Sequence, residues 1–193
     1  MNPGVKIAGL GGRFDPIHVG HLLIARQVLE FDSTIEKVIF VPAFEHQWKP
    51  IQASPEDRTE MIRSILEDKM EVSDIEIKRK GISYSIDTIK KLKSQNSKVK
   101  IYWVVGSDIV AEFDRWKNSE ELIKEATFLV FPRDPYDLPK NLPKGFKLVE
   151  TPTLQVANFS STVIRQRIKE GKTVKYLVPE KVEQYIKENN LYV

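Results

Sequence analysis

Two of the chain's three histidines lie three residues apart in the stretch GGRFDPIHVGH, which covers residues 11–21. An apolar run over residues 5–10 precedes it, and an apolar pattern at helical spacing follows over residues 21–31. We expect the helix to begin near Val19 or Gly20, so that His18 and His21 lie on roughly one side of its first turn. Two imidazoles beside the free N–H groups of a helix start form an anion site. Either ring can carry positive charge as charge builds up on a transferring phosphate.

The glycines before these histidines indicate close approach of the backbone to a ligand. The stretch is not the dinucleotide fingerprint, which needs a third glycine, nor a Walker loop, which needs a following Gly-Lys-Ser/Thr. The alternative is a capped turn with two surface histidines. The combination of glycines, proline and paired histidines in one string favours the phosphate clamp.

A second stretch, NFSSTVIRQR over residues 158–167, places hydroxyls and guanidinium groups at the start of another expected helix. Ser160, Ser161 and Thr162 come first, and Arg165 and Arg167 follow within two turns. Hydroxyls, free N–H groups and a guanidinium are suited to binding a triphosphate. The alternative is a serine N-cap followed by a solvated basic face.

Strands and helices alternate along the whole chain. The pattern predicts strands at 5–10, 37–43, 70–77, 100–106, 127–133 and 146–151, and helices at 21–31, 54–68, 85–95, 119–126 and 160–171, followed by a C-terminal helical segment at 178–192. Ser54 is the expected N-cap of the second helix, with Asp57 completing an approximate capping box. The proline-rich stretch 132–145 reads as a surface excursion. We therefore expect one domain over residues 1–193, with a Rossmann-like, doubly wound parallel sheet and helices on both faces.

Composition limits the function further. The chain has 193 residues, 41% of them hydrophobic, and a formal net charge of +3. This charge suits anionic small molecules but does not indicate nucleic acid. There is no cysteine, so thiolate metal sites and cysteine nucleophiles are excluded. No apolar run is long enough for a membrane span and no signal peptide is evident, so we expect a soluble cytoplasmic protein without a membrane partner.

The residues GRFDPIHVGH resemble the G-x-F-D-P-x-H-x-G-H signature of the nucleotidyltransferase superfamily, and FSSTVIR resembles its second signature, I-S-S-T-x-I-R. Between them, GISYSIDTIKKLK and VVGSDIVAEFDRW resemble segments of bacterial nicotinate-nucleotide adenylyltransferases. The ending YLVPEKVEQYIKENNLY also matches these enzymes. The resemblance covers essentially the whole chain, in the right order.

This resemblance implies catalytic roles for His18, His21 and Arg165. It also implies an ATP site formed by Gly11, Gly12, Arg13, Phe14, His18, His21, Gly106, Asp108, Ser160, Ser161, Thr162 and Arg165. The implied mononucleotide site comprises His46, Lys49, Ser85, Trp116, Lys117 and Arg133, with Trp116 stacking on the pyridine ring. Core packing of Trp116 and helix capping by Asp108 remain alternatives.

Two positions depart from the usual pattern. The loop PAFEHQWKP separates His46 from Lys49, where the commonest form has adjacent His-Lys, and Arg13 replaces a small residue.

The implied reaction joins ATP to nicotinate mononucleotide, releasing pyrophosphate, with magnesium held through the ATP phosphates and no dedicated metal site on the protein. Nicotinamide mononucleotide or another phosphorylated acceptor, such as phosphopantetheine, is the alternative substrate. A nucleotide-sensing module without turnover is the alternative from another class. We expect no nucleic-acid partner, and a homo-oligomer stays open.

Overall fold

The structure, a computed structural model, describes residues 4–95 and 98–193. Its strands are β1 (Lys6–Gly12), β2 (Ile35–Pro42), β3 (Met70–Val72), β4 (Lys100–Gly106), β5 (Thr127–Phe131) and β6 (Phe146–Leu148). Its helices are α1 (Val19–Phe31), α2 (Pro55–Arg63), α3 (Ile75–Arg79), α4 (Ser85–Gln95), α5 (Ser107–Val110), α6 (Ser119–Glu125), α7 (Ser161–Lys169) and α8 (Glu180–Glu188), with a 3-10 turn, η1, at Phe113–Arg115. In this part of the chain no helix is both long and apolar enough to cross a membrane.

All six strands form one parallel sheet in the order β3-β2-β1-β4-β5-β6. The chain moves outward in one direction from β1 to β3, then returns to pair β4 with the other edge of β1. The carboxyl ends of β1 and β4 therefore form the switch point at which ligands bind in open α/β sheets. The expected doubly wound fold is confirmed.

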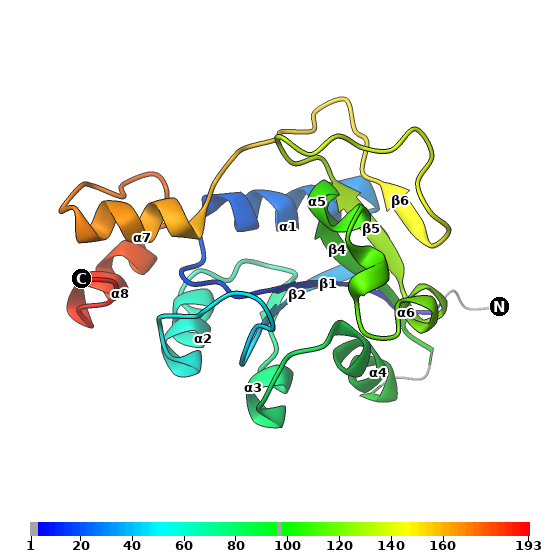
Figure 1. Cartoon of the computed structure of the whole chain (residues 1–193), viewed down its shortest axis with the longest axis horizontal. Helices are drawn as coiled ribbons and strands as arrows, with labels where there is room; N and C mark the ends of the chain where they lie inside the picture. The colour runs from blue at the N-terminus through cyan, green and yellow to red at the C-terminus, as the bar shows by residue number, and fades with distance from the viewer. Residues whose placement is uncertain (1–3, 96–97) are drawn as a thin grey trace.

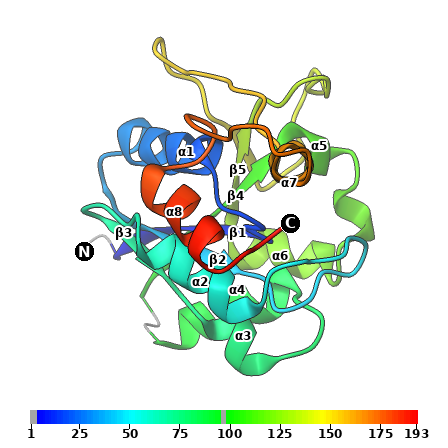
Figure 2. The ribbon, with the colours of Figure 1, turned by 90° about the vertical axis from the view of Figure 1, so that its left-hand side faces the viewer.

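The two faces of the sheet carry separate hydrophobic clusters because successive strand residues point to opposite sides. In β2, Val38 and Phe40 belong to the cluster under α1, whereas Ile39 and Val41 belong to the cluster that contains residues of α4 and α6. Figures 1 and 2 show α1 on one side of the sheet and α3 and α4 on the other, with α7 and α8 at the end where the loop 13–18 leads into α1.

Two sequence predictions were wrong around β3. The stretch 70–77 alternates like a strand, but only Met70–Val72 pairs with β2, and α3 begins at Ile75. Glu76 holds a polar position in this alternation and is nevertheless buried, so the pattern belongs to a turn of helix and not to a pleated strand. The second helix ends at Arg63 rather than at residue 68, with Ser64 as its C-cap.

Other ends are shorter than predicted. The strands expected at 127–133 and 146–151 end at Phe131 and Leu148, and the C-terminal helix spans Glu180–Glu188. Ser54 caps α2 as expected, accepting from the Asp57 amide at 3.0 Å, but its own hydroxyl donates to the Asp57 carboxylate, so the capping box is incomplete. Ser160 is the N-cap of α7 without a side-chain cap bond.

Candidate active site

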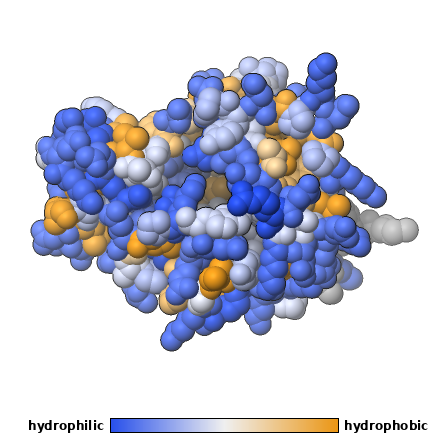
Figure 3. Space-filling model, viewed as in Figure 1, coloured by the Kyte–Doolittle hydropathy of each residue, from blue (hydrophilic) through white to orange (hydrophobic). Residues whose placement is uncertain are grey.

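A cavity of about 400 Å³ opens at the carboxyl ends of β1 and β4. Figure 3 shows a hollow near the middle of this face, surrounded largely by hydrophilic residues. Its lining brings together the two sequence stretches, which are separated by about 140 residues: Gly11–Phe14, His18 and His21 from the first, and Ser160–Thr162 from the second. The residues expected on the mononucleotide side line the same cavity, namely His46, Lys49, Ser85, Trp116, Lys117 and Arg133.

The two histidines form one compact unit at the start of α1. His18 is the N-cap and His21 the third residue of the helix, and their rings stack with 3.7 Å between centroids. The His18 amide donates to Nδ1 of His21 at 3.2 Å. Because Nδ1 of His21 accepts this bond, its ring proton is on Nε2, which leaves Nε2–H as the donor for a ligand.

Burial determines the charge of the two imidazole rings in the free protein. Burial, together with the positive charge of Arg133, lowers the pKa of His18 from 6.5 to about 4. Burial, His18 and Arg133 lower the pKa of His21 well below 6.5. The rings are therefore neutral at pH 7 in the free protein, and the expected positive charge during phosphate transfer stays a prediction. They offer neutral hydrogen bonds until an anion arrives and favours the protonated form.

The loop before the histidines is held by a fully buried carboxylate that the sequence analysis missed. Asp15 accepts from the amides of Gln52 at 2.8 Å and Ala53 at 3.0 Å, and from the hydroxyl of Tyr192 at 2.9 Å. These contacts join residues far apart in the sequence, so no local pattern could have revealed them. The only available signal was an aspartate between an aromatic residue and a proline.

Arg165 is also committed to this loop. It is 8% exposed, its Nη1 donates to the carbonyl of Asp15 at 2.7 Å and lies 3.7 Å from the Asp15 carboxylate. Among the described residues its buried Nε has no hydrogen-bond partner. In this state Arg165 stabilises the loop, and its phosphate role stays a prediction. Arg167 lies on the exposed side and donates to the carbonyl of Thr173 at 2.9 Å.

Ser161 and Thr162, by contrast, reach the cavity wall directly. The hydroxyl of Ser161 donates to the carbonyl of Pro16 at 3.0 Å, which ties the start of α7 to the first loop. The hydroxyl of Thr162 accepts from Arg165 at 3.4 Å. The two signature stretches are therefore one interlocked unit rather than two independent walls.

Two of the three glycines of β1 make room for Trp103. A Cβ at Gly9 would lie 2.4 Å from the Trp103 ring, and a Cβ at Gly11 would lie 2.7 Å from it. Trp103 is 2% exposed and also lines the cavity. The missing side chain of Gly11 thus makes room for the Trp103 indole, and its role in close approach to a ligand stays a prediction.

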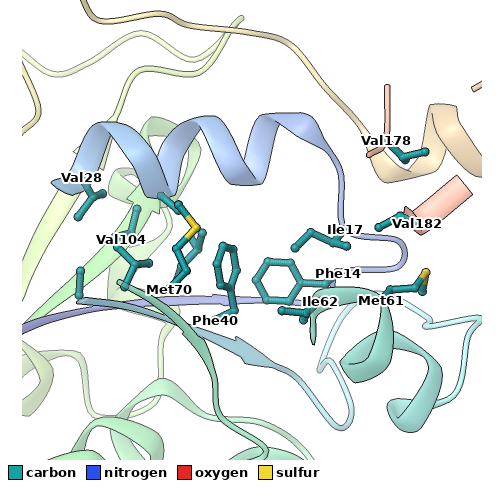
Figure 4. Packing of buried hydrophobic residues seen from close by; sticks show 14 of the residues in the cluster. Phe14, Ile17, Val28, Phe40, Met61, Ile62, Met70, Val104, Val178 and Val182 are labelled. Carbon is teal, nitrogen blue, oxygen red and sulfur yellow. The ribbon is translucent and has the colours of Figure 1, made fainter. Parts of the chain in front are cut away.

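Phe14 likewise belongs largely to the core. It is 2% exposed and meets Phe40 edge-on, with 5.7 Å between ring centroids (Figure 4). Its ring also contacts His21 edge-on at 4.9 Å between centroids. Phe14 therefore supports the histidine unit from behind while contributing to the cavity wall.

Gly106, Asp108 and Arg133 form the wall after β4. Gly106 is the N-cap of α5, and Asp108 lies inside this short helix without a capping bond, so the capping alternative for Asp108 is wrong. Arg133 donates to Oδ2 of Asp108 at 3.1 Å. Within residues 4–95 and 98–193, Oδ1 of Asp108 is buried without a partner.

On the mononucleotide side, Trp116 is half-buried and lines the cavity. The centroid of its ring lies 5.7 Å from the ring centroid of Phe113, and its Nε1 has no hydrogen-bond partner among the described residues. Lys117 is paired with Asp87 at 3.0 Å and lies over the Tyr84 ring, so its charge is already compensated. Ser85 is the first residue of α4, whose free N–H groups begin at the cavity.

The atypical loop after β2 also reaches the cavity. Nδ1 of His46 accepts from the Trp48 amide at 3.2 Å, and burial, Arg13 and Lys49 lower the pKa of His46. Arg13 donates to the carbonyl of Pro50 at 3.1 Å, so it fastens this loop to the first one. Trp48 is an exposed lining residue that sequence reasoning left out, and Arg115 lies 5.4 Å from its ring.

A buried polar cluster of Glu76, Arg79 and Thr88, between α3 and α4, was missed as well. Glu76 is 5% exposed, lines the cavity and accepts from the Thr88 hydroxyl at 2.5 Å. Arg79 donates to the same hydroxyl at 3.2 Å. Burial raises the pKa of Glu76. The cluster joins α3 to the first turn of α4.

Metal binding has no preformed cage here. Among the described residues, no group of three or more histidine and carboxylate side chains could hold a metal ion. The unpaired Oδ1 of Asp108 fits an ion that takes most of its ligands from phosphates and water.

Known proteins resemble this chain in both sequence and fold. The cytidylyltransferase-like family model matches residues 10–167. A "probable nicotinate-nucleotide adenylyltransferase" of Desulfitobacterium hafniense strain Y51 is 37% identical, covering 98% of this chain and 97% of its own length. The protein of the same name from Hydrogenobaculum sp. is 39% identical, covering 96% and 97%.

A structure of Plasmodium falciparum nicotinic acid mononucleotide adenylyltransferase complexed with NaAD superimposes with a TM-score of 0.79, covering 97% of both chains at 21% identity, which speaks for the fold. Two relatives are more than 30% identical over nearly the whole chain, and the family model matches most of it. Together these matches establish the family. The chain belongs to the cytidylyltransferase-like family and, within it, to the nicotinate-nucleotide adenylyltransferases.

Proposed function

We propose that this protein transfers adenylate from ATP to nicotinate mononucleotide, giving the deamido dinucleotide and pyrophosphate. The observation that carries the proposal is one cavity that contains both signature stretches and the aromatic side chain expected for the pyridine ring. The names of the relatives support the same reaction and the same acceptor.

The reaction needs no covalent enzyme intermediate. A phosphate oxygen of the mononucleotide attacks the α-phosphorus of ATP, the bond from this phosphorus to the bridging oxygen breaks, and pyrophosphate leaves with that electron pair. Catalysis then consists of positioning and of stabilising the charge on the transferring group. In this proposal Nε2–H of His21 and the ring of His18 donate to the reacting phosphates, while Ser161, Thr162 and Arg165 hold the outer phosphates.

Magnesium is part of the proposal as an ion held by the ATP phosphates and water. Asp108 is the residue that would hold it from the protein side, because its Oδ1 is unpaired within the described part of the chain. When bound, the ion neutralises charge on the phosphate oxygens. The protein's own part is to orient the histidine pair and to limit its access to water: His18 is 6% exposed and its ring stacks on that of His21.

The preference for the acid over the amide rests on the donors near the ring. Nicotinate mononucleotide carries a carboxylate where the alternative substrate carries a neutral amide. The N-terminus of α4 at Ser85 presents backbone N–H groups and the positive end of a helix dipole to the cavity. A charge-assisted hydrogen bond is about twice as strong as a neutral one. These donors therefore favour the carboxylate.

One assay tests the proposal. The protein is incubated with ATP, magnesium and, separately, nicotinate mononucleotide, nicotinamide mononucleotide and phosphopantetheine, and pyrophosphate release is measured. The expected result is release with both pyridine mononucleotides, faster with the acid. Release with phosphopantetheine alone, or with none of the acceptors, contradicts the proposal.

A further inference from the structure

The penultimate residue of the chain touches the loop that carries the proposed catalytic histidines. The hydroxyl of Tyr192 donates to Oδ1 of Asp15 at 2.9 Å, across 177 positions of sequence. Tyr192 is 6% exposed and Asp15 is fully buried. Burial and the Asp15 carboxylate raise the pKa of Tyr192, so its hydroxyl remains protonated and can donate.

Asp15 is the point at which this loop is fixed. Its side chain accepts from two backbone amides, of Gln52 and Ala53, on the segment before α2. Tyr192 supplies a third donor, from the segment after α8. His18, the N-cap of α1, follows Asp15 by three residues. A shift at Asp15 is therefore carried over this short distance to the stacked imidazoles.

The backbone of the same loop is held from other directions. Arg58 donates to the carbonyl of Arg13 at 2.8 Å, Arg165 to that of Asp15, and Ser161 to that of Pro16. These three bonds fix main-chain oxygens, whereas the Asp15 carboxylate is oriented by the amides of Gln52 and Ala53, by Tyr192 and by the Arg165 charge 3.7 Å from Oδ2. Tyr192 is the side-chain hydroxyl among those partners.

We infer that Tyr192 is a positioning residue for adenylate transfer: its hydroxyl sets Asp15, and through Asp15 the placement of His18 and His21. The inference rests on the proposed function, because it concerns the rate of that reaction. It assigns a role in the site to the last residues of the chain, which lie outside both signature stretches and outside the matched part of the family model.

A buried carboxylate is held in place by the donors that bind it, so the loss of one donor matters. Without the Tyr192 hydroxyl, Oδ1 of Asp15 keeps the Ala53 amide at 3.0 Å and loses its side-chain donor. A buried acceptor left short of a partner moves toward other donors or admits water. Rates fall steeply with small errors in the placement of catalytic groups, of about a hundredfold for 1 Å. We expect a part of that loss.

The test compares Tyr192→Phe with Tyr185→Phe. Tyr185, on α8, donates to Oδ1 of Asp57 at 3.0 Å, so it is also a tyrosine-to-aspartate bond that ties the C-terminal region to the α2 region. Its partner, however, lies in the first turn of α2, whose N-cap is Ser54, and is not part of the histidine loop. Both variants keep the aromatic ring, and each loses one hydroxyl.

The expected result is a kcat about tenfold lower for Tyr192→Phe, with both KM values within about threefold of wild type. Tyr185→Phe is expected to keep kcat within twofold and to lose less thermal stability, because Tyr185 is half-buried whereas Tyr192 is 6% exposed. Assays are run about 20 °C below each variant's midpoint of unfolding, so that unfolding does not enter the rate. Equal kcat for the two variants would overturn the inference.

A double-mutant cycle checks that Tyr192 acts through Asp15. If it does, Tyr192→Phe lowers kcat much less in an Asp15→Asn background than in wild type, because the two changes share one contact. Additive effects would overturn the inference even if Tyr192→Phe alone is slow. A wild-type protein that releases no pyrophosphate refutes the proposed function instead, so the two failures are distinguishable.

Discussion

The imidazole rings of His18 and His21 stack almost parallel, 3.7 Å apart, at the start of α1. Two protonated rings would repel each other at this distance, and burial lowers the pKa of both. The unit is therefore built for the neutral form. Incoming phosphate charge favours a protonated ring, so the pair can become more positive when substrate binds than it is in the free protein.

His21→Ala tests the phosphate clamp. Removing the Nε2–H donor should lower kcat by on the order of a hundredfold or more, the effect of losing one preorganised donor in a charged transition state. Its Nδ1 also accepts from the His18 amide, so the variant should lose some stability yet remain folded. Circular dichroism checks the fold and pyrophosphate release gives the rate. Near-normal turnover in a folded His21→Ala protein refutes the clamp.

The lowered pKa of His18 predicts a pH dependence of stability. The unfolded histidine titrates near 6.5 and the folded one near 4, so between these values the unfolded state binds more protons and acid favours unfolding. His18 alone should lower the free energy of unfolding by about 2 kcal/mol from pH 7.5 to pH 5. Urea unfolding at both pH values measures the difference. His18→Gln should show a smaller difference than wild type, and an unchanged one contradicts the burial argument.

Substitution of two glycines separates packing from ligand approach. Gly9→Ala and Gly11→Ala both place a Cβ against the buried Trp103 ring, and each should destabilise the fold by about 1–3 kcal/mol. Gly11 lines the cavity, whereas Gly9 lies two residues earlier in β1. Thermal unfolding and KM for ATP are measured for both. If the space at Gly11 serves Trp103 alone, the two variants have the same KM; a larger KM for Gly11→Ala indicates ligand contact as well.

Arg165→Ala should affect both stability and ATP use. The guanidinium now binds the Asp15 carbonyl in a buried site, so its loss leaves an unpaired acceptor and should cost about 1–3 kcal/mol of stability. If Arg165 also grips the outer phosphates, kcat/KM falls more for ATP than for the mononucleotide. Arg165→Lys should recover only part, because a point charge cannot replace a planar fork. Arg167→Ala, which removes a bond to Thr173 on the exposed side, is the control and should be nearly silent.

Equal losses for both substrates in Arg165→Ala would assign Arg165 to loop support alone. That outcome would leave Ser161 and Thr162, together with the free N–H groups of α7, as the phosphate contacts of the second stretch.

The sequence was sufficient for the architecture because the relevant signals are local. Apolar and alternating patterns placed a strand at each of the six positions, although the third is much shorter than predicted, and their alternation with helical patterns predicted the parallel sheet. The residues of the two signature stretches, once placed on their strand and helix ends, had to meet at the switch point. The 70–77 stretch failed because a single turn of helix and a short strand give similar apolar spacing over so few residues.

The supports of the site could not be predicted, because each joins distant parts of the chain. Nothing near Gly11 indicates that Trp103 fills its missing side chain. Nothing near Arg165 indicates that its partner is a carbonyl 150 positions earlier. The charge of the histidines depended on burial, which follows from packing rather than from spacing.

Trp116→Ala tests the pyridine side of the cavity. Trp116 is half-buried at the wall and its Nε1 is unpaired within the described residues, so the ring is partly packed on Phe113 and partly open to the cavity. Loss of an aromatic stack should weaken mononucleotide binding by about 1 kcal/mol or more, a fivefold or larger rise in its dissociation constant. ATP binding should hardly change, which titration calorimetry with each substrate can measure.

The same variant bears on the choice between acid and amide. Stacking acts on the ring and is shared by both mononucleotides, whereas the N–H groups at the start of α4 act on the substituent. Trp116→Ala should therefore lower kcat/KM for both mononucleotides by similar factors and leave their ratio in favour of the acid. Because Lys117 is paired with Asp87, Lys117→Met should change that ratio by less than threefold. A ratio favouring the amide in wild type would overturn the acceptor assignment while leaving adenylate transfer intact. A collapse of the ratio in Lys117→Met would place the selectivity in the side chain rather than in the backbone of α4.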